Sequence, residues 1–270
     1  MTAESSSLVT LLTDFGTDDP WVGSLKSVIW QISPGAKIVD LTHSVPAHDV
    51  FAGAFALYRC YRDYPEGTVH LCVVDPGVGG ARRPILVAAA GRWFVGPDNG
   101  LFSFVYEFDT VREVVHLTSD RYFHLPVSGT FHGRDIFAAV AGWLAAGVAP
   151  SDFGPSIGDW VKLAVPVDRI AGDNLVRGEV CAVDRFGNCI TNIRAATLGQ
   201  FAERTGRRRF KVLVGGREIP LVSAGGYGQD APVFALMGSS GLLELAANQR
   251  SAAQVLGVTG RGKEIGIMGA

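Results

Sequence analysis

A short segment in the first third of the chain brings one acidic residue and two arginines to the end of an apolar run. Residues 68–74 are mostly apolar, Asp75 follows them directly, and a turn rich in proline and glycine leads to Arg82 and Arg83. Carboxylates and guanidinium groups are seldom buried unless they are paired. The segment therefore predicts one of two features: an active site built on Asp75 and Arg82, or a surface hairpin with an ordinary salt bridge.

Further polar side chains stand where strands are expected to end or helices to begin. They are Asp14, Asp19, Asn99, His132, Asp184, Asn188, Asn192, Ser239 and Ser240. Each of them could also cap a helix or close a turn. The segment around Asp184 has a second interpretation, because Asn188 can hydrogen-bond the edge of a flat polar ligand and Phe186 can stack on its face.

Apolar runs that end in polar residues predict strands, and apolar residues at helical spacing predict the helices between them. The expected strands of the first half cover residues 8–12, 37–41, 68–74, 85–90, 93–95 and 113–117. We expect Asp19 to cap a helix that ends near residue 32, Asp49 to cap a second, and a third to cover residues 136–146. The alternation predicts an α/β domain with a mostly parallel sheet, whose carboxyl edge, where Asp14 and Asp75 stand, is the usual ligand site.

The pattern changes near residue 155, where glycine and proline mark a loop and the later signals are nearly all strand. The expected strands of this half cover residues 175–183, 209–214, 218–222 and 233–237. Gly215-Gly216 predicts a two-residue hairpin between two of them. We therefore expect an α/β domain over residues 1–165, a linker over 166–174 and a smaller all-β domain over 175–270.

The composition is that of a globular protein with a sizeable core, since 47% of the 270 residues are hydrophobic and 19% are charged. A formal net charge of −2 gives no reason to expect nucleic acid or a membrane surface as a partner. No apolar run reaches the roughly 18 residues of a spanning helix. Residues 1–7 lack the apolar core of a signal peptide, and the four cysteines form no CxxC pair. We expect a cytoplasmic protein with free thiols and no metal site.

Seven segments, in the same order, resemble the S-adenosylmethionine (SAM) hydroxide adenosyltransferase family, the SAM-hydrolysing relatives of the fluorinating and chlorinating enzymes. The segments are LTDFGTDDPWVGSLKSV, DLTHSVPAHDV, GTVHLCVVDPGVGGARRPI, FVGPDNGL, TFHGRDIFA, VDRFGNCITNI and GSSGLLELAANQRSAA. The resemblance covers residues 8–258. It implies cleavage of SAM at C5′ by water, which gives adenosine and L-methionine and needs no cofactor. It also implies an α/β domain, a smaller C-terminal β-barrel, and a homotrimer whose active sites combine the two domains of neighbouring subunits.

The resemblance also implies roles for individual residues. Asp75, Arg82 and His132 match the residues that activate water. The matches for substrate binding are Asp14 for the ribose, Asp19 and Asp184 near the methionine part, Phe186 and Asn188 for adenine, and Ser239 and Ser240 for the methionine carboxylate. Asn99 is a further candidate for substrate binding. Arg83 is expected to be structural, and no role is assigned to His48.

Two departures bear on the reaction. The halogenating relatives replace the segment that holds Asp75 and Arg82, whereas this chain keeps both and His132, which favours water over halide. Those relatives carry arginine where Ser240 stands here. Of the two serines, Ser240 is therefore the one that departs from the halogenating pattern. The alternatives are a SAM-dependent halogenase, a non-catalytic protein that binds SAM or adenosine, and, more remotely, a metal-dependent hydrolase.

Overall fold

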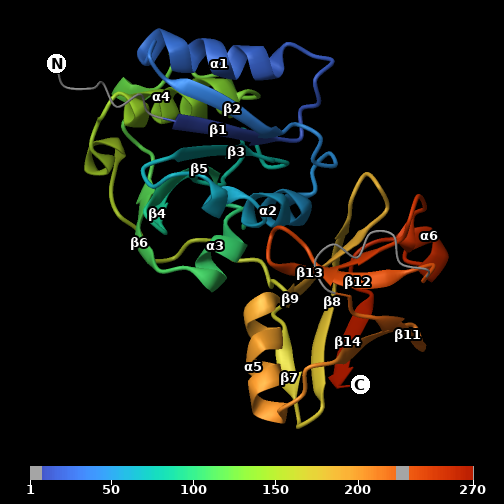
Figure 1. The fold of residues 1–270 in the computed structure, drawn as a ribbon. Coiled ribbons are helices and arrows are strands. Elements are labelled where there is room, and N and C mark those ends of the chain that lie inside the picture. The colour runs from blue at the N-terminus through green and yellow to red at the C-terminus, as the bar shows by residue number, and fades with distance from the viewer. Residues whose placement is uncertain (1–7, 223–230, 270) are drawn as a thin grey trace, which may run out of the picture. The chain divides into compact units, whose positions relative to one another are not determined.

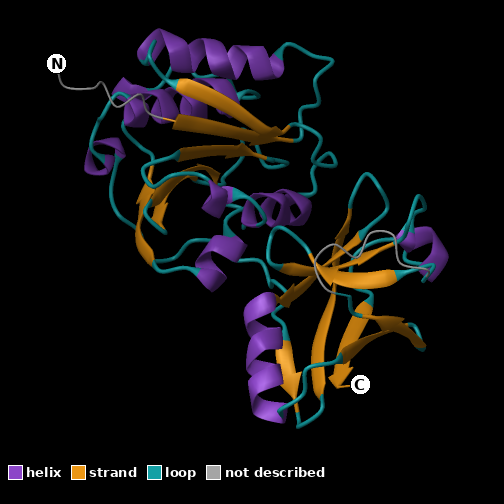
Figure 2. Ribbon diagram, in the orientation of Figure 1, coloured by secondary structure: helices purple, strands orange, loops and turns teal. Residues whose placement is uncertain are grey.

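A computed structural model describes residues 8–222 and 231–269 of the chain. Contacts within the chain divide it into two units, residues 1–165 and 166–270, which we call the N-terminal and C-terminal units. Each unit has its own sheet and its own buried core (Figure 1; Figure 2). The signal-peptide prediction concerned residues 1–7, which lie outside the described residues.

The N-terminal unit is built on a six-stranded sheet in the order β2-β1-β3-β5-β4-β6. The strands are β1 (Leu8–Thr13), β2 (Lys37–Thr42), β3 (Val69–Val73), β4 (Pro84–Ala89), β5 (Arg92–Pro97) and β6 (Val111–His116). β1 pairs in parallel with β2 and β3, and β3 pairs in parallel with β5. Only β4 runs the other way, antiparallel to both β5 and β6. The prediction of a mostly parallel sheet is confirmed.

Helices cover both faces of this sheet (Figure 1). α1 (Trp21–Ile32) packs against α4 (Ala139–Ala145) on one face, and α2 (Val50–Tyr58) lies with α3 (Ser103–Phe108) on the other. Short 3-10 turns occur at Tyr61–Asp63, Asp120–Tyr122 and Pro150–Phe153. A π-helical segment, Gly133–Ala138, leads directly into α4. The helix expected from residue 136 therefore begins earlier, and its first part is π-helical.

One predicted helix cap is correct and one is wrong. Asp49 caps α2, since its Oδ1 accepts from Ala52 N at 3.0 Å. Asp19 does not cap α1, because the helix begins at Trp21 and Pro20 takes the cap position without a side-chain hydrogen bond. The carbonyl of Pro20 already accepts from Ser24 N, so the first turn starts on the proline.

The C-terminal unit is an antiparallel sheet that almost closes into a barrel. Its strands are β7 (Arg169–Ala171), β8 (Leu175–Val183), β9 (Cys189–Arg194), β10 (Phe210–Val214), β11 (Arg217–Pro220), β12 (Phe234–Met237), β13 (Leu242–Ala246) and β14 (Glu264–Gly269). The order is β11-β10-β14-β8-β9-β13-β12, with β7 on β8, and a bridge from Leu221 to Ala235 links the two ends. The interior of this sheet is a second apolar core. The barrel-like fold is confirmed.

Several local expectations for this unit can be compared with the structure. Gly215 and Gly216 form the β10–β11 hairpin with φ of +55° and +78°, which fits a type I′ turn. The segment expected as a linker, 166–174, contains strand β7. Two helices, α5 (Ala195–Thr205) and α6 (Ala252–Leu256), were not predicted.

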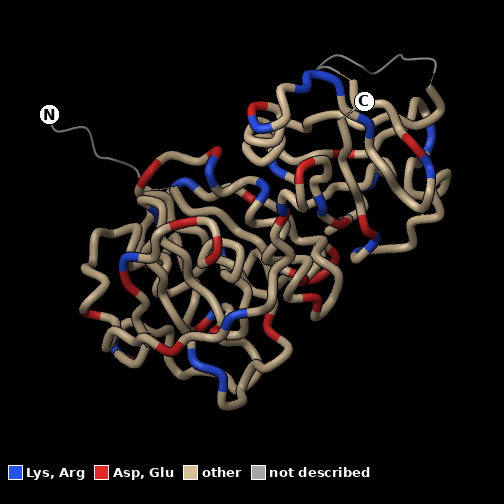
Figure 3. Tube along the Cα trace, turned by 90° about the horizontal axis from the view of Figure 1, so that it is seen from below, with Lys and Arg blue, Asp and Glu red and all other residues tan. Residues whose placement is uncertain are grey.

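The cysteines have the free state expected from the sequence. All four cysteines are free, and burial raises the pKa of the Cys60 thiol to about 11. Acidic and basic residues are distributed over both units (Figure 3). In the described part of the chain, no helix is both long and apolar enough to cross a membrane.

Candidate active site

The loop that follows β3 holds an ion pair with very little exposure to solvent. Arg82 Nε donates to both carboxylate oxygens of Asp75, at 2.9 and 3.0 Å, and Arg82 Nη2 also donates to Oδ2. The side chains of Arg82 and Asp75 are only 9% and 5% exposed. A surface hairpin with a solvated salt bridge would leave both groups open to water. The observed burial of Asp75 and Arg82 therefore does not fit that interpretation.

The same guanidinium reaches a third side chain. Arg82 Nη2 lies 2.9 Å from Nδ1 of His132, the residue before the π-helical segment. Because a guanidinium has donors only, Nδ1 must be the unprotonated acceptor, and the proton of the neutral ring is on Nε2. The guanidinium also lies over the buried ring of Phe137, 5.1 Å from its centroid. The loop after β3 and the segment before α4 are thus joined at one arginine.

Two features make this cluster chemically unusual. Arg82 Nη1 is buried and has no hydrogen-bond partner, although buried cationic donors are normally satisfied. Burial, together with the charge of Arg82, lowers the pKa of His132 below its ordinary value, while Asp75 and Asp135 oppose the shift. A neutral imidazole can keep accepting from Arg82 Nη2 and so hold the guanidinium in place.

Close backbone approach positions the loop. Gly79 has a φ of +73°, and a Cβ added there would overlap the carbonyl oxygen of Gly129. That region precedes His132, so a glycine is what allows the two segments to meet.

The end of β3 is held by Asn99, which donates from Nδ2 to Val74 O at 2.9 Å and accepts from Leu101 N at 3.2 Å. Both ends of the Asn99 amide are used inside the protein, at the residue next to Asp75.

The neighbouring arginine has a different environment. Arg83 donates to Asp98 Oδ2 at 2.7 Å and to Asp159 Oδ1 at 2.8 Å. These bonds tie the start of β4 to the end of β5 and to the loop near residue 159. The expectation that Arg83 is structural agrees with these contacts.

A cavity of about 420 Å³ lies at the carboxyl ends of β1 and β3. It is lined by Asp14, Phe15, Trp21, Ala47, His48, Val73, Asp75, Val78, Thr130, Phe131 and Gly133. Asp14 Oδ2 accepts from His48 N at 2.9 Å, which holds His48 at a φ of +66°. Asp14 and Asp75, predicted from separate strand ends, therefore share one cavity. Asp19 is exposed and is not part of its wall.

Sequence reasoning missed several residues of this wall. His48 was given no role, and the aromatic residues Trp21, Phe15 and Phe131 were not singled out. Trp21 follows Asp19 by two residues, and Phe131 directly precedes His132. Closeness in sequence to predicted site residues is therefore the signal that could have found them. The aromatic rings contact one another: Trp21 and Phe131 have centroids 5.2 Å apart, and Phe131 and Phe15 are 6.0 Å apart.

The C-terminal unit gathers three predicted residues in the β8–β9 turn. Asp184 Oδ1 accepts from the backbone N–H of Phe186 and Asn188, and Oδ2 accepts from Asn188 Nδ2. The turn presents Phe186 with its side chain 78% exposed, whereas Asn188 is buried. Phe186 and Asn188 line a cavity of about 530 Å³ with Ala247, Gln249, Arg250 and Ser251. An exposed ring beside a polar cavity is suited to stacking on a flat ligand.

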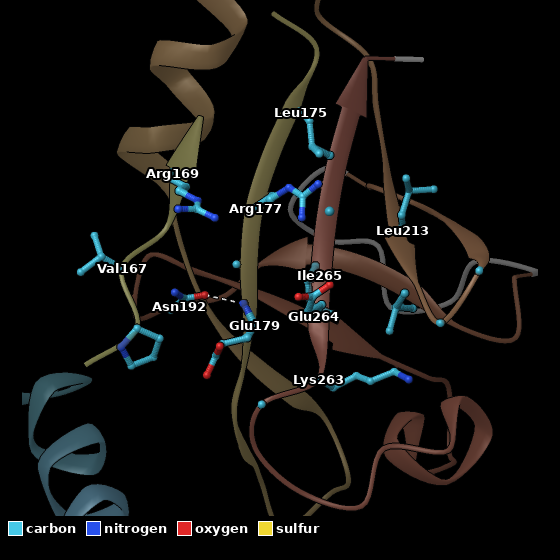
Figure 4. A pocket seen from close by; sticks show the side chains of 17 residues that line it. Val167, Arg169, Leu175, Arg177, Glu179, Asn192, Leu213, Lys263, Glu264 and Ile265 are labelled. Atoms are coloured by element: carbon cyan, nitrogen blue, oxygen red, sulfur yellow. Dashed lines mark hydrogen bonds between the residues drawn. The ribbon is translucent and has the colours of Figure 1, made fainter. Parts of the chain in front are cut away.

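The two serines lie in the turn between β12 and β13. Ser239 is exposed, and Ser240 Oγ is buried without a hydrogen-bond partner. Asn192 is buried on β9, where its Oδ1 accepts from Glu179 N at 2.7 Å. Asn192 also lines a third cavity, of about 750 Å³, whose charged side chains include Arg169, Arg177 and Lys263 (Figure 4). None of the other predicted site residues lines that third cavity.

In the described residues, no group of three or more His, Cys, Asp or Glu side chains could hold a metal ion. The fold and these clusters define a two-unit protein. An Asp–Arg–His cluster stands at the carboxyl edge of a mostly parallel sheet, and an antiparallel β unit follows it in the sequence.

Comparison with known proteins identifies the family. Residues 9–154 match the SAM hydroxide adenosyltransferase N-terminal domain, and residues 178–264 match the SAM hydroxide adenosyltransferase C-terminal domain. The chain therefore belongs to the SAM hydroxide adenosyltransferase family. It is 41% identical to an (R)-S-adenosyl-L-methionine hydrolase of Thermus thermophilus, over 93% of this chain and 95% of that protein.

The chain is also similar to a named fluorinase and to a solved structure. A fluorinase of Actinoplanes is 27% identical over 92% of this chain and 93% of that protein. The crystal structure of an uncharacterized conserved protein from Thermotoga maritima has a TM-score of 0.86 and 36% identity. That comparison covers 96% of this chain and 99% of the other.

Proposed function

We propose that this protein hydrolyses S-adenosyl-L-methionine at C5′ to adenosine and L-methionine. The observation that carries the proposal is the buried Arg82, fixed by Asp75 and His132, where Asp75 also lines the cavity. Its family and its 41% identity to a named SAM hydrolase support the substrate. Because that relative is named for the R form of the substrate, both sulfonium epimers belong in the assay.

The chemistry requires help for the nucleophile and little for the leaving group. Sulfur carries a positive charge in SAM, so methionine departs as a neutral thioether and needs no general acid. Water is a poor nucleophile. In the proposal, Asp75 holds the water in the cavity, and the adjacent fixed charge of Arg82 stabilises the developing hydroxide. Asp75 lines the cavity and has lone pairs beyond those that Arg82 occupies, so it accepts the water proton.

His132 has a more limited role in this scheme than a general base. Its Nδ1 already accepts from Arg82, so it is not available to take a proton from water without breaking that bond. We propose that neutral His132 orients the guanidinium, and that the water keeps a lone pair free for attack on C5′. Alignment of the water behind C5′, opposite sulfur, supplies the remaining rate acceleration by positioning.

We assign the substrate-binding roles on the family resemblance and the local geometry. Asp14 would hold the ribose hydroxyls, and Asp19 and Asp184 would lie near the methionine part. Phe186 and Asn188 would bind adenine, and Ser239 and Ser240 would contact the methionine carboxylate. The internal bonds of Asn99 favour positioning of the loop over a direct contact with substrate. We further propose a homotrimer in which neighbouring subunits contribute the two domains of each site, with no cofactor.

An isotope experiment tests the reaction. The protein is incubated with each SAM epimer in ¹⁸O water, with and without chloride or fluoride and a chelator, and the products are separated and weighed. We expect adenosine labelled at the 5′ hydroxyl, equal methionine, and unchanged turnover with chelator. Unlabelled adenosine would overturn attack at C5′, a 5′-halo product would indicate a halogenase, and tight binding without products over hours would indicate a binding protein.

Single substitutions test the water-handling cluster. We expect Asp75→Ala and Arg82→Ala each to lower turnover by at least about 10²-fold while SAM still binds, since an electrostatic contact to the nucleophile is removed. Arg83→Ala is the matched control, because it removes the adjacent guanidinium, which bonds Asp98 and Asp159 instead. Turnover unchanged in either cluster variant would remove that residue from the proposal.

A further inference from the structure

The cavity beside Asp75 has an aromatic wall that begins at Trp21. Trp21 is the first residue of α1, and its side chain is 45% exposed although it is large and apolar. Its ring meets Phe131 almost perpendicularly, at an interplanar angle of 79°. Both residues line the cavity together with Phe15. An exposed tryptophan fixed against a second ring at a cavity wall is placed for a ligand rather than for a core.

Within that wall, Trp21 is the aromatic ring best placed to receive a cation. Phe131 already has a cation beside it, because the guanidinium of Arg134 lies over its ring at 5.3 Å from the centroid. Arg134 is itself held by Asp135. Among the described residues, no cationic side chain lies over the ring of Trp21, and indole is the strongest cation–π acceptor among the side chains.

The charge of the cavity points the same way. Its lining includes the carboxylates of Asp14 and Asp75 and, among the described residues, neither Lys nor Arg. His48 is the remaining ionisable side chain on the wall. Arg82 is outside this lining and is paired with Asp75. Acidic groups and aromatic faces together favour a positively charged ligand over an anionic one.

The geometry of the proposed reaction decides which cation this is. The water activated by Asp75 and Arg82 must approach C5′ to about 3 Å, with sulfur one bond further on the opposite side. Sulfur must therefore lie across the cavity from Asp75 and Arg82. Trp21 and Asp75 line the same cavity, and the ring of Trp21 contacts Phe131, the residue before His132 in the sequence.

We propose that the indole of Trp21 binds the sulfonium end of SAM and recognises its positive charge; this inference rests on the proposed function. The bond changes fix the kinetic consequence. As water oxygen bonds to C5′, the C5′–S electron pair moves to sulfur, the sulfonium charge disappears, and the water proton passes to Asp75. Trp21 therefore stabilises the ground state more than the transition state, so its removal raises KM and does not lower kcat.

A pair of stable ligands tests charge recognition without turnover. S-adenosylhomocysteine is the neutral thioether, and sinefungin carries a protonated amine in place of the sulfonium methyl group. Their dissociation constants are measured by calorimetry for the wild type, Trp21→Leu, Trp21→Phe and Trp30→Leu. Trp30 is the matched control, since it is on the same helix, is 47% exposed, and is not part of the cavity wall.

We expect Trp21→Leu to weaken sinefungin about tenfold, and S-adenosylhomocysteine by less than about threefold, which corresponds to the loss of one cation–π contact. Trp21→Phe should recover part of the loss, and Trp30→Leu should change neither constant. With SAM as substrate, Trp21→Leu should raise KM about tenfold and leave kcat unchanged or higher, so that kcat/KM falls by less than KM rises.

Three results would overturn the inference. They are equal weakening of both ligands by Trp21→Leu, no weakening of either, or the same loss in Trp30→Leu. Failure of the proposed function has a different signature. The wild type would then release no adenosine from SAM, while the two calorimetric constants would still report on charge recognition at Trp21.

Discussion

At the scale of single residues, His132 is defined by the hydrogen bond that its Nδ1 accepts from Arg82. The lowered pKa means that the ring stays neutral to a pH below its ordinary 6.5. Above the lowered pKa the bond to Arg82 is intact, and as pH falls through it a proton on Nδ1 displaces the guanidinium. We therefore expect the acid limb of kcat/KM to have its midpoint below pH 6.5, measured as a pH–rate profile.

A glutamine at this position separates orientation from proton transfer. Glutamine can accept from Arg82 through Oε1 and donate through Nε2, but it does not titrate. We expect His132→Gln to stay within about tenfold of the wild type and to lose this acid limb, and His132→Ala to lose about 10²-fold. If His132→Gln were completely inactive under conditions in which the wild type is fully active, His132 would instead be the general base.

At the scale of elements, the loop from residue 75 to 82 depends on its contact with the segment before the π-helix. We expect Gly79→Ala to lower kcat/KM at least tenfold, because the new Cβ is strained at a φ of +73° and meets a backbone oxygen that cannot move aside freely. Gly129→Ala is the matched control on the other side of the contact, since a Cβ there meets nothing within 4 Å. Equal effects of the two substitutions would contradict this account, as would a fully active Gly79→Ala.

Much of the element pattern was predictable because local signals and tertiary structure agree. The strand that ends at Asp75, the Asp49 cap and the Gly215-Gly216 hairpin all follow from side-chain types at fixed offsets. α5 was missed although Gly206 ends it in the left-handed conformation, because its start has no side-chain cap and it buries few residues, Thr197 and Phe201 among them. The false cap at Asp19 arose because an aspartate before proline fits either arrangement.

The candidate site was predictable only in part, for a related reason. Strand ends meet at one sheet edge, so Asp14 and Asp75 could be placed together from the pattern. The bond from Arg82 to His132 joins residues 50 positions apart through a glycine contact that no periodicity encodes. The exposure of Trp21 likewise depends on how α1 and Phe131 pack, which the helical spacing of the sequence does not specify.

At the scale of the whole molecule, pH acts on stability through a histidine remote from the proposed chemistry. His70 is fully buried on β3, where its Nδ1 lies 2.7 Å from Thr10 Oγ1 and its ring stacks on Phe94. Burial lowers the pKa of His70 to about 3, and its Nε2 has no hydrogen-bond partner. The folded protein therefore excludes a proton that the unfolded chain binds near pH 6.5.

The sign of the stability change follows from that difference. Above pH 6.5 His70 is neutral in both states and has no effect; below it, only the unfolded chain takes up the proton, so stability is lost progressively down to about pH 3. The limiting slope for one proton is about 1.4 kcal/mol per pH unit. We expect wild-type unfolding free energy to fall more steeply than that of His70→Gln between pH 6 and 4, by about 1 kcal/mol per unit.

Tryptophan fluorescence during urea unfolding measures this directly, because all five tryptophans lie in residues 1–165, the unit that contains His70. Carboxylates that titrate in the same range are common to both proteins and cancel in the difference. His48→Gln is the control, since His48 is exposed and its replacement removes a histidine without opening the core. Parallel curves for wild type and His70→Gln would show that the buried ring accepts its proton while the sheet stays folded, and that acid unfolding starts elsewhere in the chain.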